Sequence, residues 1–339
     1  MRRFLAIVTV WMMVLAAGAL VAQQAAPPAG APAGAGPIPW AYGFPPAGAP
    51  PAAAPAPAAP DDGSKKSLTG STGSFTLTEI RNGFGPADWY PDDHPAMPEV
   101  VAKGRAKDVR ACSLCHYPNG KGRAENASVN DLPVAYFIQQ MQDFKNGVRK
   151  SAEPRKANTN AMIAIAKGMT DDEIKQAAEY FAKVKMTPWV KVVEVKDVPK
   201  TRIAGGLFLK LDGTATEPLG QRIIEVPENT ERTEMLRDPR SGFIAYVPVG
   251  SVKKGEALVM NGAGKTTACG ICHGADLKGL GPVPGLAGRS PSYLVRQMWD
   301  MKTGNRAGVW SDLMKPVLTK LAEDDLLNIA AYTASRPLN

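Results

Sequence analysis

Histidine and cysteine are scarce in this sequence. Among 339 residues there are three histidines, His94, His116 and His273, and four cysteines. Two metal centres with two histidine ligands each would need four histidines, so the chain alone cannot build that arrangement. The first cysteine is Cys112, which excludes a lipid-modified cysteine near the N-terminus.

Long runs of a single charge are also missing. The net charge is +8 and the sequence pI is about 9.2, but acidic residues are interleaved with the lysines and arginines. A nucleic-acid binder would carry dense basic runs, which this sequence does not have. The moderate basic excess instead favours redox partner proteins with acidic docking surfaces.

An apolar N-terminal segment predicts export from the cytoplasm. Arg2 and Arg3 precede a charge-free run from Phe4 to Val21, and small residues such as Ala19 and Ala22 offer cleavage sites. This is the layout of a secretory signal peptide over residues 1–22. The run is also about long enough to remain as an uncleaved anchor. Both interpretations predict a periplasmic location, and the second predicts a tether to the inner membrane.

The next segment, residues 23–72, predicts a disordered linker. Up to Pro60 it consists almost entirely of alanine, proline and glycine. Such a composition buries too little apolar surface to fold, and its prolines favour an extended, semi-rigid spacer. We therefore expect this segment either to have no task or to hold the folded part away from a membrane or partner.

The chain beyond the linker contains an internal repeat. The motif "CSLCH" at 112–116 recurs as "CGICH" at 269–273. The residues that follow recur in the same order: Tyr136, Gln140, Met141, Asp143, Arg149 and Met162 match Tyr293, Gln297, Met298, Asp300, Arg306 and Met314. This indicates two copies of one structural unit. We assign the first unit to residues 73–187 and the second unit to residues 250–339.

Each unit is predicted to be helical, whereas the connector between them is not. Apolar residues recur at helical spacing after the first motif, and Thr170 with Glu173 forms a capping box before the last helix of the first unit. In the second unit Ala322 replaces the capping hydroxyl. The connector, residues 188–249, has short β-branched and aromatic runs between glycines and prolines, which predict strands. The fold class is therefore mainly α, with a strand-containing connector.

The two repeated motifs predict covalent haem attachment. Both read Cys-x-x-Cys-His, in which two thiols form thioethers with the porphyrin vinyl groups and the histidine becomes the proximal iron ligand. Disulfides or thioredoxin-like thiol pairs do not explain why a histidine follows each second cysteine. We expect two haem c groups, held by the following residues: Cys112, Cys115, His116, Cys269, Cys272 and His273.

The ligand on the other face of each iron decides between a carrier and an enzyme. All four thiols are used and the histidines are too few, so methionine is the remaining strong candidate. Met162 and Met314 occupy matching positions in the repeats, which favours them as axial ligands. Met141 and Met298 also match, but they lie in apolar helical stripes and are expected to pack in the cores. His94 is expected in a surface loop.

Each unit resembles a class I cytochrome c, and the pair resembles the dihaem cytochromes of the c4 type. The resemblance covers roughly residues 110–185 and 250–339, including "CGICHGADLKGLGPVPGLAGRSPSYLVRQMWDMKTGNR". It implies that a proline carbonyl accepts the N–H of the proximal histidine. Pro284 fits that role for His273, whereas Ala127 stands at the same place in the first unit. The resemblance thus implies a more flexible site, or a different potential, at the first motif.

The leading functional hypothesis is one-electron transfer between periplasmic or membrane redox partners, without catalysis by this chain. A peroxidase-like dihaem enzyme with one open iron is the main alternative, and a docked cytochrome subunit of a larger oxidoreductase is another. A basic ring around the first motif would steer an acidic partner, or would simply be solvated. Its members are Lys103, Arg105, Lys107, Arg110, Lys121 and Arg123.

Overall fold

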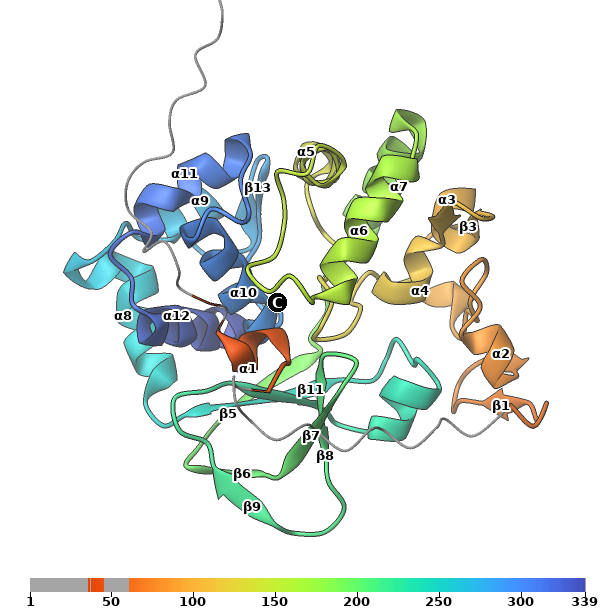
Figure 1. The fold of residues 1–339 in the computed structure, drawn as a ribbon, viewed down its shortest axis with the longest axis horizontal. Helices are drawn as coiled ribbons and strands as arrows, with labels where there is room; N and C mark the ends of the chain where they lie inside the picture. Colours follow the sequence, from red (N-terminus) through yellow and green to blue (C-terminus); the bar gives the residue numbers. More distant parts are fainter. Residues whose placement is uncertain (1–35, 37, 46–60, 339) are drawn as a thin grey trace, which may run out of the picture. The chain divides into compact units, whose positions relative to one another are not determined.

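A computed structural model describes residues 36, 38–45 and 61–338. In this part of the chain two helical units are joined by a connector built of strands, as the sequence predicts (Figure 1). Each helical unit has its own hydrophobic core. The fold is therefore mainly α, with the β-structure concentrated in the connector.

The first unit packs three longer helices around one core. Val101, Phe137 and Phe181 are buried there, and the Thr170–Glu173 capping box is present at the start of its last helix. Met141 is 5% exposed in this core, which confirms its predicted packing role. The elements are α3 (Glu99–Ala102), β3 (Gly104–Arg105), β4 (Val109–Arg110), α4 (Cys112–His116), α5 (Val134–Lys145), α6 (Ala157–Gly168) and α7 (Asp171–Lys183).

The second unit repeats this helical arrangement. Its first and last helices pack so closely that a Cβ at Gly255 would clash with the backbone carbonyl of Asn328. Ala322 lacks a capping hydroxyl, but its own backbone N–H donates to the Asp325 carboxylate at 2.8 Å. Met298 is buried in the core, as predicted. The elements are α8 (Ser251–Asn261), η3 (Gly262–Gly264), α9 (Gly270–His273), β12 (Gly279–Leu280), β13 (Val283–Pro284), α10 (Pro291–Lys302), α11 (Val309–Leu318) and α12 (Glu323–Ser335).

The connector forms a three-stranded sheet and two separate strand pairs. The sheet order is β10-β11-β5, in which β11 pairs antiparallel with β10 and parallel with β5. Ala245 of β11 is buried in the core of the second unit, and Phe243 of β11 is buried in a smaller cluster with Trp189. The sheet therefore packs against both groups of apolar side chains. The strands are β5 (Val190–Val195), β6 (Asp197–Pro199), β7 (Thr201–Ala204), β8 (Leu207–Lys210), β9 (Thr216–Pro218), β10 (Ile224–Pro227) and β11 (Phe243–Pro248).

Residues 38–45 correct part of the predicted linker. They contain the short helix α1 (Pro39–Tyr42), which lies beside α10 in Figure 1. Ile38 and Tyr42 are buried, and the Tyr42 hydroxyl donates to the Asp300 carboxylate at 2.6 Å. The prediction of disorder is therefore wrong for residues 38–45, because their apolar side chains find a place in the core of the second unit.

The end of the predicted linker is also ordered. Residues 61–72 include β1 (Lys66–Ser67), which pairs with β2 (Ser74–Phe75). Folded structure thus begins before the boundary at residue 73. The predicted signal peptide or anchor over residues 1–22 lies outside the described residues, as do residues 46–60 of the predicted linker. Within the described part of the chain, no helix has the length and apolarity needed to cross a membrane.

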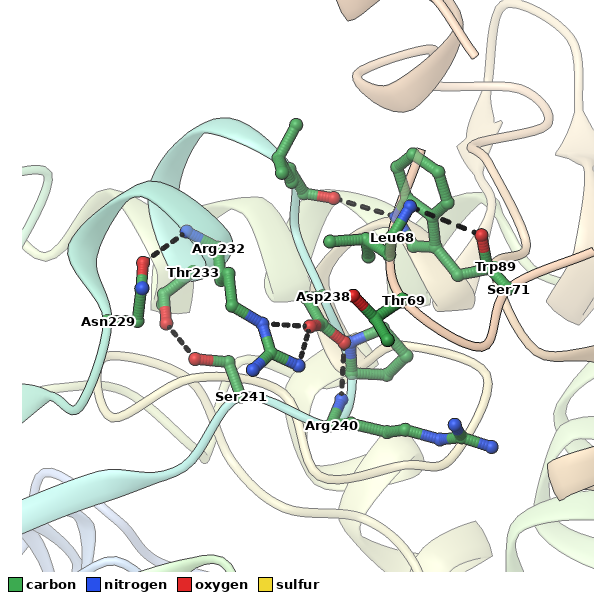
Figure 2. A network of polar contacts seen from close by, with 12 residues as sticks. Leu68, Thr69, Ser71, Trp89, Asn229, Arg232, Thr233, Asp238, Arg240 and Ser241 are labelled. Carbon is green, nitrogen blue, oxygen red and sulfur yellow. Dashed lines mark hydrogen bonds and ion pairs between the residues drawn. The ribbon is translucent and has the colours of Figure 1, made fainter. Parts of the chain in front are cut away.

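Residues 61–98 are fastened to the connector by a polar network (Figure 2). Trp89 is 1% exposed, and its indole N–H donates to the Leu236 carbonyl at 2.7 Å. Asp238 accepts from the side chain of Arg232 and from the backbone N–H of Arg240. The guanidinium of Arg240 lies over the Tyr90 ring. The segment contains α2 (Leu77–Ile80) and η1 (Pro91–Asp93), and the facing part of the connector contains η2 (Glu231–Met235).

Candidate functional site

The first motif holds its histidine in a defined orientation. The motif forms α4, and His116 is buried, with its ring Nδ1 2.8 Å from the Ala127 carbonyl oxygen. A carbonyl can only accept, so Nδ1 carries the proton and donates it. Nε2 is then the unprotonated nitrogen, which is the form that binds a metal ion. Burial lowers the pKa of His116 and so favours this neutral form.

The second motif repeats this geometry. It occupies α9, with Cys269 as the residue before the helix. His273 is buried, and its Nδ1 lies 2.8 Å from the Pro284 carbonyl oxygen, as the resemblance implied. Burial lowers the pKa of this histidine too. Both histidines therefore present Nε2 as the metal-binding nitrogen. For His116 the acceptor carbonyl belongs to Ala127 instead of a proline.

The cysteines are not bonded to one another, and burial disfavours ionisation of Cys112, Cys115 and Cys269. All four thiols are free. Burial raises the pKa of Cys112 to about 12 and the pKa of Cys269 to about 11. A reactive thiol–disulfide pair requires a thiolate, and therefore a lowered pKa. The interpretation of these thiols as a disulfide or a thioredoxin-like pair thus finds no support in the structure.

A cavity of about 310 Å³ adjoins the first motif. Ligand pockets commonly begin at about this size. Its walls include Cys112, Cys115 and His116 of the motif. They also include Met162, which lies in α6. The structure therefore brings the predicted methionine to the same cavity as the proximal histidine. Met141 also lines this cavity, in addition to its place in the core.

Met314 matches Met162 in the sequence of the second unit. It lies in α11 and packs, partly buried, against the core of that unit. Three large apolar side chains on α9 and α11 remain exposed: Ile271, Val309 and Leu313, at 67%, 70% and 72%. α9 and α11 thus carry exposed apolar side chains.

Charged residues for which the sequence predicted no role also line the cavity. Lys156 is 3% exposed, and its Nζ has no hydrogen-bond partner in the described structure. Burial lowers its pKa to about 7. Arg149 and Arg296 line the same cavity. Glu125 and Asp300 line the cavity too, and their charges partly oppose the lowering of the Lys156 pKa. Because five lysines and arginines line the cavity against these two carboxylates, its wall suits an anionic ligand group.

Matched residues of the two repeats meet at the boundary between the units. Arg149 donates to Gln140 at 2.9 Å and to Gln297 at 3.0 Å. Arg306 reciprocates, donating to Gln297 at 2.8 Å and to Gln140 at 2.7 Å. The backbones of Arg149 and Arg306 form an antiparallel bridge. The sequence shows that these residues recur in both units. It does not show that the equivalent residues contact each other.

His94 is held by other groups. Its Nε2 lies 3.2 Å from the Asp88 carboxylate, and its Nδ1 lies 2.9 Å from the Pro95 carbonyl. His94 lies in the loop between η1 and α3, as predicted, but its side chain is only 5% exposed. Burial alone would lower the pKa of His94, but the hydrogen bond and charge of Asp88 raise it overall.

The predicted basic ring is smaller than the sequence indicates. Lys103, Arg105, Lys107 and Arg110 are exposed, on the segment just before α4. Arg123, in contrast, is 13% exposed and forms ion pairs with Glu125 and Glu234. Lys121 is also partly buried, which lowers its pKa. The exposed part of the ring is therefore Lys103, Arg105, Lys107 and Arg110.

Comparison with known proteins gives similar stretches about as long as one unit. No family model matches the chain. Over 76 residues the chain is 38% identical to cytochrome c-554(548) of Halomonas halodenitrificans, covering 22% of this chain and 92% of that protein. Over 79 residues it is 43% identical to cytochrome c4 of Pseudomonas aeruginosa, covering 23% of this chain. That match spans only 38% of the length of the cytochrome c4.

Two further proteins are similar to this chain. Over 106 residues the chain is 30% identical to the cytochrome subunit of sulfide dehydrogenase of Chlorobaculum tepidum, covering 31% of this chain and 88% of that subunit. The structure is similar to crystalline reduced cytochrome c4 of Pseudomonas stutzeri, with a TM-score of 0.43 and 20% identity. That likeness covers 66% of this chain and 92% of the other.

Proposed function

Because this chain belongs to the c-type cytochromes, we propose that it is a dihaem electron carrier that passes single electrons between redox partners outside the cytoplasm. The observation that carries the proposal is the duplicated histidine geometry. Each Cys-x-x-Cys-His motif has a buried histidine whose Nδ1 donates to a backbone carbonyl. This leaves Nε2 as the ligand for an iron ion at both motifs.

Bound haem would supply an iron that alternates between the ferric and ferrous states, one electron at a time. The chain's task is to attach, orient and enclose that group. Thioether bonds would form at Cys112 and Cys115 in the first unit and at Cys269 and Cys272 in the second. His116 and His273 would be the proximal ligands.

The charged wall of the first cavity fits the carboxylate side chains of a haem. Lys156 has a buried Nζ without a hydrogen-bond partner in the described structure, and Arg149 lines the same cavity. A haem carboxylate beside them would supply the hydrogen-bond acceptor that the Lys156 Nζ lacks in the described structure, and would add to the charges of Glu125 and Asp300. It would also stabilise the charged form of Lys156, whose pKa is lowered to about 7, chiefly by burial.

Met162 and Met314 are proposed as the second axial ligands. Met162 lines the same cavity as His116, and Met314 holds the matching position on α11. A thioether ligand raises the reduction potential and leaves no position open for a small substrate. This supports a carrier over a peroxidase-like enzyme. The ring nitrogens of His94, the third histidine, already contact Asp88 and Pro95.

The location and partners of the carrier follow from charge and from the N-terminal sequence. Arg2, Arg3 and the apolar run after them support export to the periplasm, with the run either cleaved or kept as a tether to the inner membrane. The exposed basic residues before α4 support docking of a partner with an acidic surface. They are Lys103, Arg105, Lys107 and Arg110.

A second candidate is a cytochrome subunit of a larger oxidoreductase. The similarity to the cytochrome subunit of sulfide dehydrogenase favours it. The redox chemistry of this chain would be the same for both candidates. A subunit would stay bound to its partner, whereas a free carrier would bind and dissociate. Purification of the exported protein from its native host distinguishes the two. A stable larger complex supports the subunit, and a monomer in sedimentation supports the free carrier.

Absorption spectroscopy of the exported holoprotein tests the proposal. We expect a sulfur-to-iron band in the red for the oxidised protein, and no carbon monoxide shift after reduction. Met162→Ala and Met314→Ala should each remove about half of the band, whereas Met260→Ala is the control because Met260 is 54% exposed on α8. A carbon monoxide shift of about one haem in the unaltered protein would refute the closed carrier and favour the enzyme.

A further inference from the structure

Arg289 connects the two units through three backbone carbonyls. It precedes α10 and is 5% exposed. Its Nε donates to the Gly285 carbonyl at 2.6 Å, within the second unit. Its Nη1 donates to Ser128 at 2.9 Å and its Nη2 to Asn130 at 3.2 Å, both in the first unit. One buried guanidinium thus binds a loop from each unit.

These loops are the ones that orient the proximal histidines. In the first unit Ala127 accepts from His116, and the next carbonyl along the chain, Ser128, accepts from Arg289. In the second unit Pro284 accepts from His273, and again the next carbonyl accepts from Arg289. The order of acceptors is therefore the same in both loops.

The arrangement is not a consequence of the repeat. In the register where Tyr136 matches Tyr293, Arg289 corresponds to Leu132, so the second unit alone supplies the guanidinium. All three hydrogen-bond partners of Arg289 are neutral carbonyls. Asp131 acts on the positive charge of Arg289 without a hydrogen bond, so the charge lies between the two loops with no directly bonded carboxylate, in an environment of low polarity.

We propose that Arg289 is a positioning residue that sets the reduction potentials of both haems together. The proposal rests on the proposed function, because it requires haem at both motifs. The hydrogen bond to a proximal histidine tunes the electron density that the ring gives to iron. Arg289 holds both acceptor loops in place, and its charge favours the reduced state, which carries one more electron.

The test is a redox titration of the holoprotein with three variants at two positions. Arg289→Met removes both the charge and the donors, whereas Arg289→Lys keeps the charge but cannot reach three carbonyls. We expect both midpoints to fall in Arg289→Met, by about a tenfold change in the reduction equilibrium of each haem, or ~59 mV for one electron. Arg289→Lys should lower both by less. Pro284→Ala should move one wave only, which assigns that wave to the second haem.

The matched control is Arg222→Gln. Arg222 also donates to backbone carbonyls, at Leu219 and Pro218, but within the connector, where it pairs with Glu217 as well. It should leave both potentials unchanged. A thermal unfolding midpoint that falls in both Arg289 variants with unchanged potentials would overturn the proposal and leave Arg289 a structural link. A shift of only one of the two midpoint potentials in Arg289→Met would also overturn it.

The titration separates this proposal from the proposed function. Two one-electron waves that shift together support the role of Arg289, even if carbon monoxide binding shows one iron to be open. A single wave, together with one haem per chain in a pyridine haemochrome assay, would refute haem at both motifs. That outcome would overturn the proposed function, and the role of Arg289 with it.

Discussion

Substitution of Tyr42 tests whether α1 belongs to the folded protein. Tyr42 is fully buried, and its hydroxyl donates to the Asp300 carboxylate at 2.6 Å. Tyr42→Phe keeps the ring but removes this donor. Asp300 then retains the backbone N–H of Ala152, at 2.7 Å, and loses its hydroxyl partner. Because the carboxylate is 3% exposed, water replaces that partner poorly.

The cost follows from the charge and burial of the acceptor. A hydrogen bond to a charged group contributes about 1.5–3 kcal/mol. We therefore expect Tyr42→Phe to lower the free energy of unfolding by about 2 kcal/mol, a change of ~30-fold in the ratio of folded to unfolded protein. Tyr42→Ala also removes the buried ring and should cost about 3–5 kcal/mol.

The assay is urea unfolding of the holoprotein, followed by far-ultraviolet circular dichroism. Tyr246→Phe is the matched control, because Tyr246 is a partly exposed residue of β11. It should change stability by less than about 0.5 kcal/mol. If Tyr42→Phe were equally silent, α1 would not be docked on the second unit, and the correction to the predicted linker would itself be wrong.

Three further substitutions test other contacts. Gly43→Ala should lower the free energy of unfolding by at least about 1–2 kcal/mol, because Gly43 has φ +68° and a Cβ there would clash with the Gly206 carbonyl; thermal unfolding measures this. Asp88→Asn should destabilise the protein at pH 5 more than at pH 8. Asp88 raises the pKa of His94 in the folded state, so its stabilisation is fully present below the unfolded pKa and is lost as pH rises through the folded one. Equal losses in urea unfolding at both pH values would contradict this reasoning. Trp89→Phe should cost about 1–3 kcal/mol by leaving a buried carbonyl without its donor, and no change in the urea midpoint would contradict it.

The helical units were predictable because their signals are local and occur twice. The Cys-x-x-Cys-His motifs, the apolar spacing of α5 and the capping box at Thr170 each depend on residues within a few positions of one another. The carbonyl partners of His116 and His273 were predictable too, since the resemblance fixes their spacing.

Other features depend on contacts between distant residues. The parallel pairing of β11 with β5 joins strands that are separated by most of the connector, and no local pattern specifies it. The helix α1 was missed because the alanine, proline and glycine around it dominate the composition, although Ile38 and Tyr42 carried an apolar signal. Arg123 was predicted to belong to an exposed basic ring because the sequence does not reveal its ion pairs with Glu125 and Glu234.

The reciprocal contacts of Arg149 and Arg306 have the form of an isologous interface. In such an interface residue i of one subunit contacts residue j of the other, and j contacts i in return. Here Gln140 and Gln297 each accept from both arginines. The two units therefore associate as the subunits of a homodimer do, within one covalent chain. Because the connector keeps the two halves at a high effective concentration, this small polar contact needs little intrinsic affinity to stay formed, and each half is free to diverge in sequence away from the shared axis.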